Sequence, residues 1–359
     1  MPEREVVELT RELVSIPSHE DETAAGDAIE SWLREETDAE VTRDEAGNVI
    51  ARKGTGPSLA LVGHHDVVPP DDSQVDDGGG YVVEERQGRL YGRGTADMKG
   101  SVAAAMVAFR DADPTCELVF ASFVGEETSG IGATAAIEDG FVPDYAIVGE
   151  GSTNYSADGV TDVVVAHRGR RGSVLSVEGS ACHASEPEAG VNAVYRACDA
   201  VDVVRETEPP ATAVLGHDVQ GSLAVTGFHS GETWNVIPDS AAVHIDERTV
   251  PGEYAPLERV EEVAGVEWTV ESDVPPMACD DESFADLVLD AARGAQDAAP
   301  ELVTKPHATD AGRLAAAGTT CVVCGASEPG EAHTRDESVG VDVLERCYRI
   351  YRDAAESLS

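Results

Sequence analysis

Hydrophobic and polar residues follow one another along the chain in a pattern that predicts helices first and buried strands afterwards. Apolar residues recur at helical spacing over Arg4–Val14 and Thr23–Glu35, which indicates two amphipathic helices. The Ala-rich segment 101–111 predicts a further helix, and three short apolar runs predict buried strands: Leu59–Val62, Leu118–Val124 and Tyr145–Val148. Strands that alternate with helices favour an α/β fold with a mostly parallel central sheet.

The order of elements changes near residue 170. It becomes strand, helix, strand, strand, helix, strand, over Ser173–Val177, Val191–Glu206, Ser222–Phe228, Ala241–Thr249, Glu253–Val263 and Val266–Val270. This order is the signature of a ferredoxin-like unit. Helices near Ser283–Gly294 and Val341–Ser359 and a strand near Thr320–Val323 then return to the α/β pattern. We expect a catalytic, metal-binding domain of residues 1–169 and 274–359, with a ferredoxin-like α+β domain of residues 170–273 inserted into it.

The charge of the chain excludes some partners. Acidic residues outnumber basic ones by 69 to 25, which gives a formal net charge of -44. A surface dominated by carboxylates repels nucleic acid and anionic membranes, so we expect neither as a partner. The acidic residues are spread along the whole chain, which contains only three lysines. This pattern is typical of adaptation to high intracellular salt, and we expect a salt-loving source.

The cysteines and the first residues indicate a cytoplasmic location. The seven cysteines are odd in number and lie mostly in apolar or helical stretches, as reduced thiols of a cytosol do. Cys321 and Cys324 have C-x-x-C spacing, but they lie in a strand-like run without a second pair, so we expect no zinc or redox site there. The acidic start differs from a secretion signal, and no apolar stretch approaches the roughly 18 residues of a membrane span.

Three apolar runs end in a glycine that is followed at once by a potential metal ligand. The pairs are Gly63-His64, Gly125-Glu126 and Gly149-Glu150. Because ligands of open α/β sheets bind at the carboxyl ends of the strands, we expect the three side chains to converge. In a chain with 69 acidic residues, any single glutamate is more readily explained as a solvated surface charge than as a metal ligand. The positions of these glutamates favour a functional role instead. A carboxylate directly after a buried run is costly to remove from water unless a cation, a hydrogen bond or a cleft accepts it.

Other residues near these runs complete a candidate metal site. Asp66 follows His64 by two positions and could hold its imidazole in the tautomer that binds metal, whereas His65 should face away. Asp97 directly precedes the Ala-rich helix and could bridge two cations. Gly92 and Gly94 lack the third glycine of a dinucleotide loop. Histidines and carboxylates without thiolates suit zinc, cobalt or manganese. A pair of such cations also needs a free carboxylate to move protons, and Glu126-Glu127 supplies one base and one ligand.

These motifs together resemble the co-catalytic zinc amidohydrolases, which include succinyl-diaminopimelate desuccinylase, acetylornithine deacetylase, aminoacylase and glutamate carboxypeptidase. The resemblance covers essentially the whole chain. It implies two divalent metal ions, a catalytic α/β domain and an inserted ferredoxin-like lid that usually forms a homodimer interface. By motif, His64 and Glu150 resemble the ligands of the first metal, Asp97 the bridging ligand, and Glu127 and His333 the ligands of the second metal. Glu126 resembles the general base and acid, and Asp66 the carboxylate that orients His64.

The resemblance also implies residues that hold the substrate. His183, in Gly179–Ser185, matches the family histidine that reaches the active site of a neighbouring subunit and steadies the oxyanion. Asn235 and Arg248 resemble substrate-holding positions, and Arg170 looks like the arginine that clamps a substrate carboxylate. Thr309 lies where the desuccinylases carry a Gly-Thr-Ser-Asp loop, although the stretch here reads Pro306-His307-Ala308-Thr309-Asp310.

The activity expected from this resemblance is hydrolysis of the amide bond of a small N-acyl amino acid. The candidates are N-succinyl-diaminopimelate and N-acetylornithine, and also lysine or ornithine attached to an acidic carrier protein. The loop differs at 306–310, and the stretch 76–81 lacks the aromatic Pro-Phe element of the desuccinylases. Two alternatives therefore remain open: a metallo-carboxypeptidase or dipeptidase that acts on short peptides, and a non-catalytic binding protein that retains the fold.

Overall fold

A computed structural model describes residues 2–358 of the chain, with side chains from Arg4 onward, and the chain folds into two compact units. The first unit comprises residues 1–166, 278–305 and 309–359. The second comprises residues 167–277 together with the three residues Pro306–Ala308. The sequence did not predict that this short segment of the 306–310 loop would join the second unit. Within residues 2–358 no helix is both long and apolar enough to cross a membrane.

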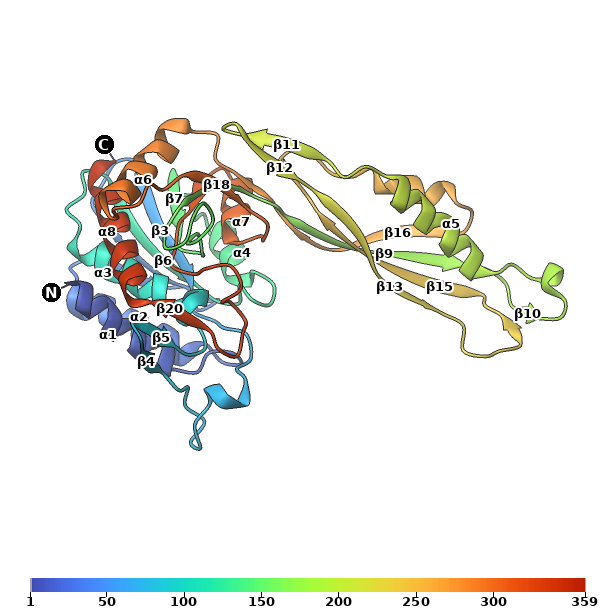
Figure 1. Cartoon of the computed structure of the whole chain (residues 1–359), viewed down its shortest axis with the longest axis horizontal. Helices are drawn as coiled ribbons and strands as arrows, with labels where there is room; N and C mark the ends of the chain where they lie inside the picture. Colours follow the sequence, from blue (N-terminus) through green and yellow to red (C-terminus); the bar gives the residue numbers. More distant parts are fainter. Residues whose placement is uncertain (1, 359) are drawn as a thin grey trace. The chain divides into compact units, whose positions relative to one another are not determined.

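The first unit is an α/β fold built on one sheet (Figure 1). In spatial order its strands are β1 (Glu40–Arg43), β2 (Val49–Lys53), β6 (Glu117–Phe123), β3 (Ser58–His64), β7 (Tyr145–Val148), β19 (Thr320–Val323), β8 (Val163–His167) and β17 (Met277–Ala278), and β18 (Leu302–Lys305) pairs with β8. The four central strands, from β6 to β19, are parallel, whereas β1 pairs antiparallel with β2, β2 with β6 and β8 with β19. The expected α/β class is confirmed, but the sheet is mixed rather than mostly parallel.

Helices pack on both sides of this sheet (Figure 1). The first group is α1 (Pro2–Ser15), α3 (Gly100–Asp111), α6 (Glu282–Gly294) and α8 (Val341–Ser357), and the second includes α4 (Ile131–Glu138) and α7 (Asp310–Ala316), while α2 (Thr23–Glu36) contacts β1 and β2. The helix expected to end at Ser359 ends at Ser357, and Ser359 lies outside the described residues. All residues of α3 from Gly100 to Phe109 are buried, because this helix contacts β3 and β6 as well as α1 and α8. Small alanine side chains permit such close packing.

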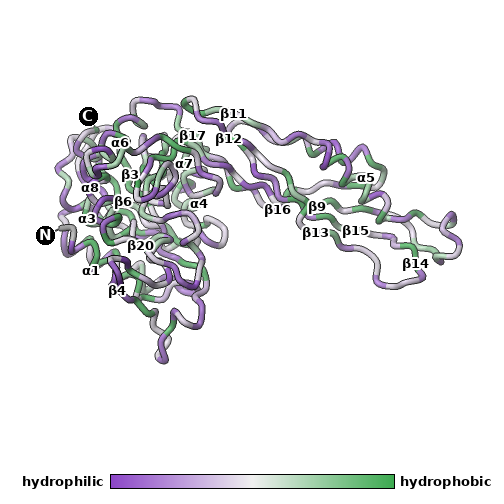
Figure 2. The backbone as a smooth tube through the Cα atoms, in the orientation of Figure 1, coloured by the Kyte–Doolittle hydropathy of each residue, from purple (hydrophilic) through white to green (hydrophobic). Residues whose placement is uncertain are grey.

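Three further elements complete the first unit. A small antiparallel sheet contains β4 (Glu84–Arg86), β5 (Arg89–Tyr91) and β20 (Ser338–Gly340). Two helical turns, η1 (Asp72–Gln74) and η2 (Thr95–Lys99), lie in the loops after β3 and before α3. Figure 2 shows apolar residues along β3 and β6, as expected for strands that helices cover on both faces.

The second unit contains a four-stranded antiparallel sheet in the order β13 (Ser222–Ser230), β15 (Ser240–Arg248), β9 (Arg170–Glu178) and β16 (Val266–Val274). Counted along the chain, these strands stand in the order second, third, first, fourth, and α5 (Ala193–Glu206) follows the first of them, as in a ferredoxin-like unit. The helix predicted over Glu253–Val263 is instead a 3₁₀ segment, η4 (Leu257–Glu262). Leu257 and Val260 of η4 join α5 and the inner face of the sheet in one apolar core.

Short elements lie between these strands. The hairpin β11 (Ala211–Val214) and β12 (His217–Gln220) follows α5, and β10 (Cys182–His183) pairs with β14 (Val236–Ile237). The turn η3 (Pro187–Ala189) lies between β10 and α5. The pairing of β10 with β14 brings His183 opposite Val236, next to Asn235.

Candidate metal centre

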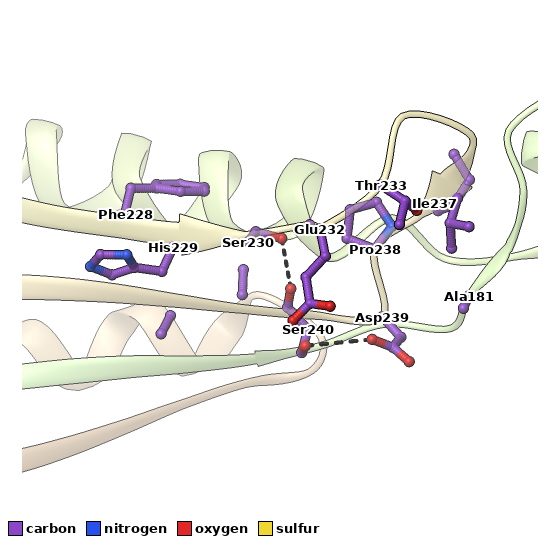
Figure 3. Close-up of a pocket in the computed structure, with 14 residues that line it drawn as sticks. Ala181, Phe228, His229, Ser230, Glu232, Thr233, Ile237, Pro238, Asp239 and Ser240 are labelled. Atoms are coloured by element: carbon purple, nitrogen blue, oxygen red, sulfur yellow. Dashed lines mark hydrogen bonds between the residues drawn. The ribbon is translucent and has the colours of Figure 1, made fainter.

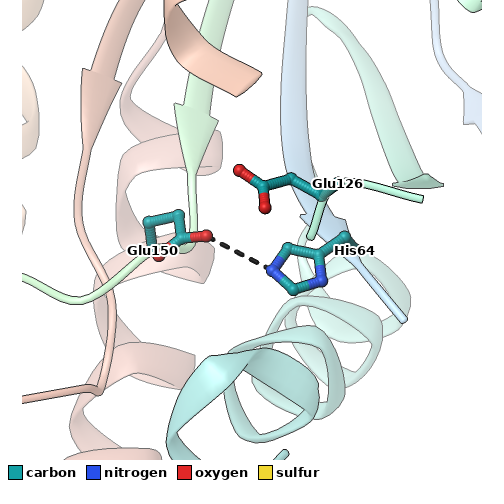
Figure 4. Close-up of side chains that lie close together, drawn as sticks. All are labelled: His64, Glu126 and Glu150. Carbon is teal, nitrogen blue, oxygen red and sulfur yellow. Dashed lines mark ion pairs between the residues drawn. The ribbon is translucent and has the colours of Figure 1, made fainter. Parts of the chain in front are cut away.

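The carboxyl ends of three neighbouring parallel strands place His64, Glu126 and Glu150 together. His64 is the last residue of β3 and lies in register with Phe123 of β6, while Val62 lies in register with Val148 of β7. Glu126 and Glu150 follow these partner strands within three residues, so they reach the same edge of the sheet. One ligand atom from each of the three lies within 4.8 Å of the others (Figure 4).

Asp66 orients His64 and also the loop after β6. The Nδ1 atom of His64 lies 3.2 Å from Oδ1 of Asp66 and 3.1 Å from its backbone oxygen. The same carboxylate accepts the backbone N–H groups of Glu126 and Glu127, at 3.1 and 3.0 Å. The ring is therefore held with Nε2 directed toward the other candidate ligands, as is usual when a carboxylate supports a metal-binding imidazole.

The two carboxylate oxygens of Asp97 face two different histidines. Asp97 lies in η2, directly before α3, and His64 Nε2 is 3.2 Å from its Oδ1. His333 Nε2 is 3.2 Å from its Oδ2. An aspartate placed in this way can bridge two cations.

His333 and Glu127 complete a second group of ligands around Asp97. His333 Nε2 lies 3.0 Å from the carboxylate of Glu127. His333 has a left-handed backbone conformation, with φ 64°, which is uncommon for a residue other than glycine and is found more often at functional sites. About half of its side chain is exposed, at 52%, so this side of the centre is open to solvent.

The distances within these two groups fit a pair of bound cations. His64 Nε2 is also 3.3 Å from Glu150 Oε1, so the Nε2 atom of each histidine has two carboxylate neighbours at 3.0–3.3 Å. Ligands held at about 2.0–2.2 Å from a tetrahedral metal ion lie roughly 3.4 Å apart. The donor set is nitrogen and oxygen, without sulfur, which suits zinc, cobalt or manganese.

The charges of the centre also fit two divalent cations. The centre contains five carboxylates, those of Asp66, Asp97, Glu126, Glu127 and Glu150. All but Glu126 belong to ion pairs in which their side chains are at most 13% exposed. Lys305 is the cation beside them, with Nζ 3.4 Å from Glu150. If all five carboxylates are ionised and the histidines are neutral, four negative charges remain uncompensated among these groups. Two divalent cations carry four positive charges, which removes the cost of this burial.

Glu126 is set apart from the other carboxylates by its surroundings. Burial raises the pKa of Glu126 well above its ordinary value, and Asp310, Glu150 and Asp97 add to the rise, although His64 opposes it. By contrast, the pKa of Glu150 is lowered, because Lys305 and His64 outweigh burial and the charge of Asp97. A carboxyl group whose pKa is raised in this way suits a general acid and base rather than a fixed ligand.

The sequence reasoning missed three buried groups beside the centre. Lys305 Nζ donates to Gly151 O at 3.0 Å and pairs with Glu150. Burial raises the pKa of Asp310 to about 7. Glu337 is fully buried against the loop that carries Asp97. The sequence held a signal for each: Lys305 is one of only three lysines, Asp310 ends the 306–310 stretch compared above with the desuccinylase loop, and Glu337 follows His333 by four residues.

His65 lies away from His64, as its place in an extended segment predicts. It is fully buried, and its Nδ1 atom lies 2.9 Å from Ser122 Oγ. Burial lowers the pKa of His65 to about 3, so the ring is neutral. This residue is part of the core.

The residues predicted to contact the substrate lie in the second unit, except for Thr309. Arg170 and Arg248 both contact Asp246, with Nε to carboxylate distances of 2.8 and 2.7 Å. The exposed ring of His183 lies 2.6 Å from Ser185 Oγ, and Asn235 O accepts the N–H of Ala184 at 2.9 Å. These contacts hold His183 and Asn235 close to each other. Thr309, in the first unit, is buried, and its Oγ1 accepts the N–H of Ala311 at the start of α7.

A separate hollow of about 980 Å³ lies in the second unit, between the end of β13 and β14 (Figure 3). Ser230 Oγ donates to Ser240 O across it, at 2.6 Å. Its described lining includes none of the candidate metal ligands, and neither His183 nor Asn235. The candidate metal centre therefore lies elsewhere, at the strand ends of the first unit.

Comparison with known proteins agrees with this geometry. The model of Peptidase family M20/M25/M40 matches residues 60–357, which run from within β3 to the end of α8 and include every candidate metal ligand discussed above. The chain belongs to this family. The M20 family consists of metal-dependent hydrolases, so the chain is an M20 hydrolase with a candidate metal centre.

Individual M20 relatives resemble the chain at modest identity. A succinyl-diaminopimelate desuccinylase of Bordetella avium is 31% identical over 347 residues, which cover 89% of this chain and 88% of that protein. An acetylornithine deacetylase of Pectobacterium carotovorum is 34% identical over 214 residues, or 57% of this chain and 54% of that protein. The crystal structure of the aminopeptidase PepT from Bacillus cereus shares the M20 fold, with a TM-score of 0.81, 20% identity and 99% coverage of both chains.

Proposed function

We propose that this M20 hydrolase binds two divalent cations and cleaves the amide bond of a small N-acyl amino acid. Zinc is the first candidate for the metal, with cobalt or manganese as alternatives. One observation carries the proposal. Asp97 faces His64 with one oxygen and His333 with the other, while Glu150 and Glu127 complete the two groups. Glu126 lies beside them, is partly buried and has a raised pKa.

The names of two relatives support the choice of substrate class. One is a succinyl-diaminopimelate desuccinylase and the other an acetylornithine deacetylase, so both names describe removal of an acyl group from an amine. We propose N-succinyl-diaminopimelate as the first substrate to test, since that relative matches the chain over the greater length.

In the proposed reaction, Glu126 moves the proton. Two bound cations would polarise the acyl carbonyl and make a water molecule more acidic. Glu126 accepts the proton of the attacking water and then donates it to the departing amine, a transfer that suits a group whose pKa is raised. Asp66 holds the backbone N–H group of Glu126, which fixes the start of this side chain.

Residues of the second unit are proposed to hold the substrate. Arg170 and Arg248 share the single carboxylate of Asp246, which leaves one excess positive charge in a strongly acidic chain. A substrate carboxylate is the natural partner for such a guanidinium. We also assign His183 and Asn235 to the substrate, because their neighbouring positions allow them to act together on an acyl oxygen.

We propose that the second unit forms a homodimer interface. It contains eight of the ten large apolar side chains that are exposed in the described chain: Val191, Tyr195, Val225, Phe228, Trp234, Val236, Tyr254 and Val270. Exposed apolar residues that gather in this way mark interaction surfaces. Light scattering coupled to size-exclusion chromatography should give twice the mass of one chain, and a single-chain mass at micromolar concentration would refute the dimer.

The substrate assignment can be tested with purified protein that is loaded with zinc, cobalt or manganese in molar KCl. The panel contains N-succinyl-diaminopimelate, N-acetylornithine, other N-acetyl and N-succinyl amino acids, and di- and tripeptides, and the released amine is measured. We expect an acyl amino acid to have the highest kcat/KM. Preferential cleavage of peptides would favour the peptidase alternative, and failure to cleave any compound with two metals bound would refute the proposal.

A further inference from the structure

A buried carboxylate, Glu337, joins the two loops that carry Asp97 and His333. Glu337 follows His333 by four residues and directly precedes β20. Because β20 pairs with β5 so that Ser338 lies opposite Tyr91, Glu337 lies beside Gly92, whose N–H donates to its backbone oxygen at 3.1 Å. The strand register therefore places this side chain against the start of the Asp97 loop.

The loop wraps around one carboxylate oxygen of Glu337. Oε1 accepts the backbone N–H groups of Gly94, Ala96 and Asp97, at 2.9, 3.0 and 3.1 Å. Gly94 makes this possible with a left-handed φ of 87°, and a Cβ atom there would lie 2.7 Å from a Val67 methyl carbon. Backbone N–H groups that converge in such a turn form a site for an anion.

The other oxygen of Glu337 pairs with Arg93. The Nη1 atom of Arg93 lies 2.5 Å from Oε2, and the two side chains are 4% and 0% exposed. Four donors thus surround one buried carboxylate. This arrangement has no role in the proton transfer assigned to Glu126.

We propose that Glu337 is a positioning residue for the metal centre: it fixes the backbone of Asp97 so that both oxygens of that side chain face their histidines. The inference rests on the proposed function, because it assumes that Asp97 bridges two cations. The distances from Asp97 to His64 and to His333 are both 3.2 Å, so a shift of the loop would lengthen one of them. Glu337 also restricts the positions that His333 can take, since only four positions of sequence separate the two residues.

Glu337→Gln tests this role with little change in volume. In one amide orientation the NH₂ group faces three N–H donors, and in the other it faces Arg93, so donors oppose each other in both. We expect the affinity for the second cation to fall by about 10- to 100-fold, as is typical when a group that supports metal ligands is lost. Competition with a chromophoric chelator measures this affinity, and the visible spectrum of the cobalt-loaded protein should change because the ligand geometry changes.

Glu247→Gln is the matched control. Glu247 is also 0% exposed, pairs with Arg171 and accepts the N–H of Ala255, but it lies in the second unit. The Glu247→Gln variant should lose stability in the same way, because it too replaces a buried carboxylate that is paired with an arginine. Its zinc affinity and cobalt spectrum should not change. A second comparison is Arg93→Gln, which retains the three N–H contacts and should weaken metal binding much less than Glu337→Gln does.

Four outcomes overturn the inference or separate it from the proposed function. Unchanged metal affinity and cobalt spectrum in Glu337→Gln would overturn it, as would an equal loss in Glu247→Gln. If Glu337→Gln does not fold in molar KCl, then Glu337→Asp, which retains the charge on a shorter side chain, should show the affinity loss, and wild-type affinity would refute the role. If the unmodified protein itself fails to bind two cations, the proposed function fails instead.

Discussion

Single carboxylates orient several groups at once in this centre. Asp66 contacts the ring of His64 and also the N–H groups of Glu126 and Glu127, so one side chain fixes a candidate ligand and the candidate base. Asp97 similarly faces two histidines. Because each such residue has more than one partner, its loss should disturb several groups together, whereas the loss of Glu126 should disturb only the proton transfer.

Glu126→Gln should therefore separate catalysis from metal binding. We expect kcat to fall by about 10²- to 10⁴-fold, which is the usual contribution of general acid and base catalysis, because an amide cannot accept the proton. Metal content, measured by atomic emission on the purified protein, should stay at two ions per chain. The neighbouring variant Glu127→Gln is the control and should lose the second ion. Near-normal turnover in Glu126→Gln would show that another group moves the proton.

Short elements place the groups that surround the centre. Helix α7 begins directly after Thr309, and its first residue is the buried Asp310. Thr309 is the cap of this helix, since its hydroxyl accepts the N–H of Ala311 at 3.2 Å. The substrate role expected for Thr309 stays a prediction, but the cap gives the residue a structural role in any case.

Thr309→Ala should reduce the free energy of unfolding by about 1 kcal/mol, the usual cost of losing a helix cap. Thr309→Ser retains the hydroxyl and should stay close to the unmodified protein. Urea denaturation in molar KCl measures both. If the two variants unfold at the same urea concentration, the cap contributes nothing. A rise in KM that is larger in the alanine variant than in the serine variant would support the additional contact with substrate.

At the scale of the whole molecule, negative charge dominates. The net charge of -44 is distributed over a chain whose candidate metal centre is itself rich in carboxylates. Like charges oppose the compact state until salt or bound cations screen them. Adaptation to high salt and a cytoplasmic location stay predictions from the composition.

The metal-free protein should lose stability as the pH rises. Burial raises the pKa of Glu22, Asp310 and Glu337 to about 7, from ordinary values of 4.5, 3.8 and 4.5. The folded chain thus binds these protons more tightly than the unfolded chain does. Their stabilising contribution is complete below the ordinary values and is lost as the pH rises through 7. Thermal unfolding with a chelator at constant KCl should show a falling Tm between these limits.

The stabilisation that bound zinc provides should have the opposite dependence on pH and increase as the pH rises. Hydrogen bonds to Asp97 and Glu127 raise the pKa of His333 to about 10 in the metal-free protein. A metal ion requires the neutral ring, so binding must release this proton, and affinity should increase with pH. The rise in Tm that zinc causes should therefore be larger at about pH 8 than at about pH 5. An equal rise at both values would contradict the participation of His333.

The sequence alone determined the features that depend on short segments. An apolar run followed by glycine and a ligand predicts a strand end at His64, Glu126 and Glu150, and parallel neighbours must bring such ends to one edge. The order of strands and helices after residue 170 likewise predicted the ferredoxin-like sheet. These inferences need only local periodicity and the rules of strand connection.

Only the tertiary structure decided the contacts between distant segments. It placed Lys305 against Glu150 and Glu337 against the Asp97 loop, across 155 and 240 positions of sequence. It also made β1, β2 and β8 antiparallel and reduced the segment 253–263 to a 3₁₀ turn. The reason is physical: burial and hydrogen bonding of a polar side chain depend on which elements pack against it, and in an acidic chain many glutamates have the same local sequence signal.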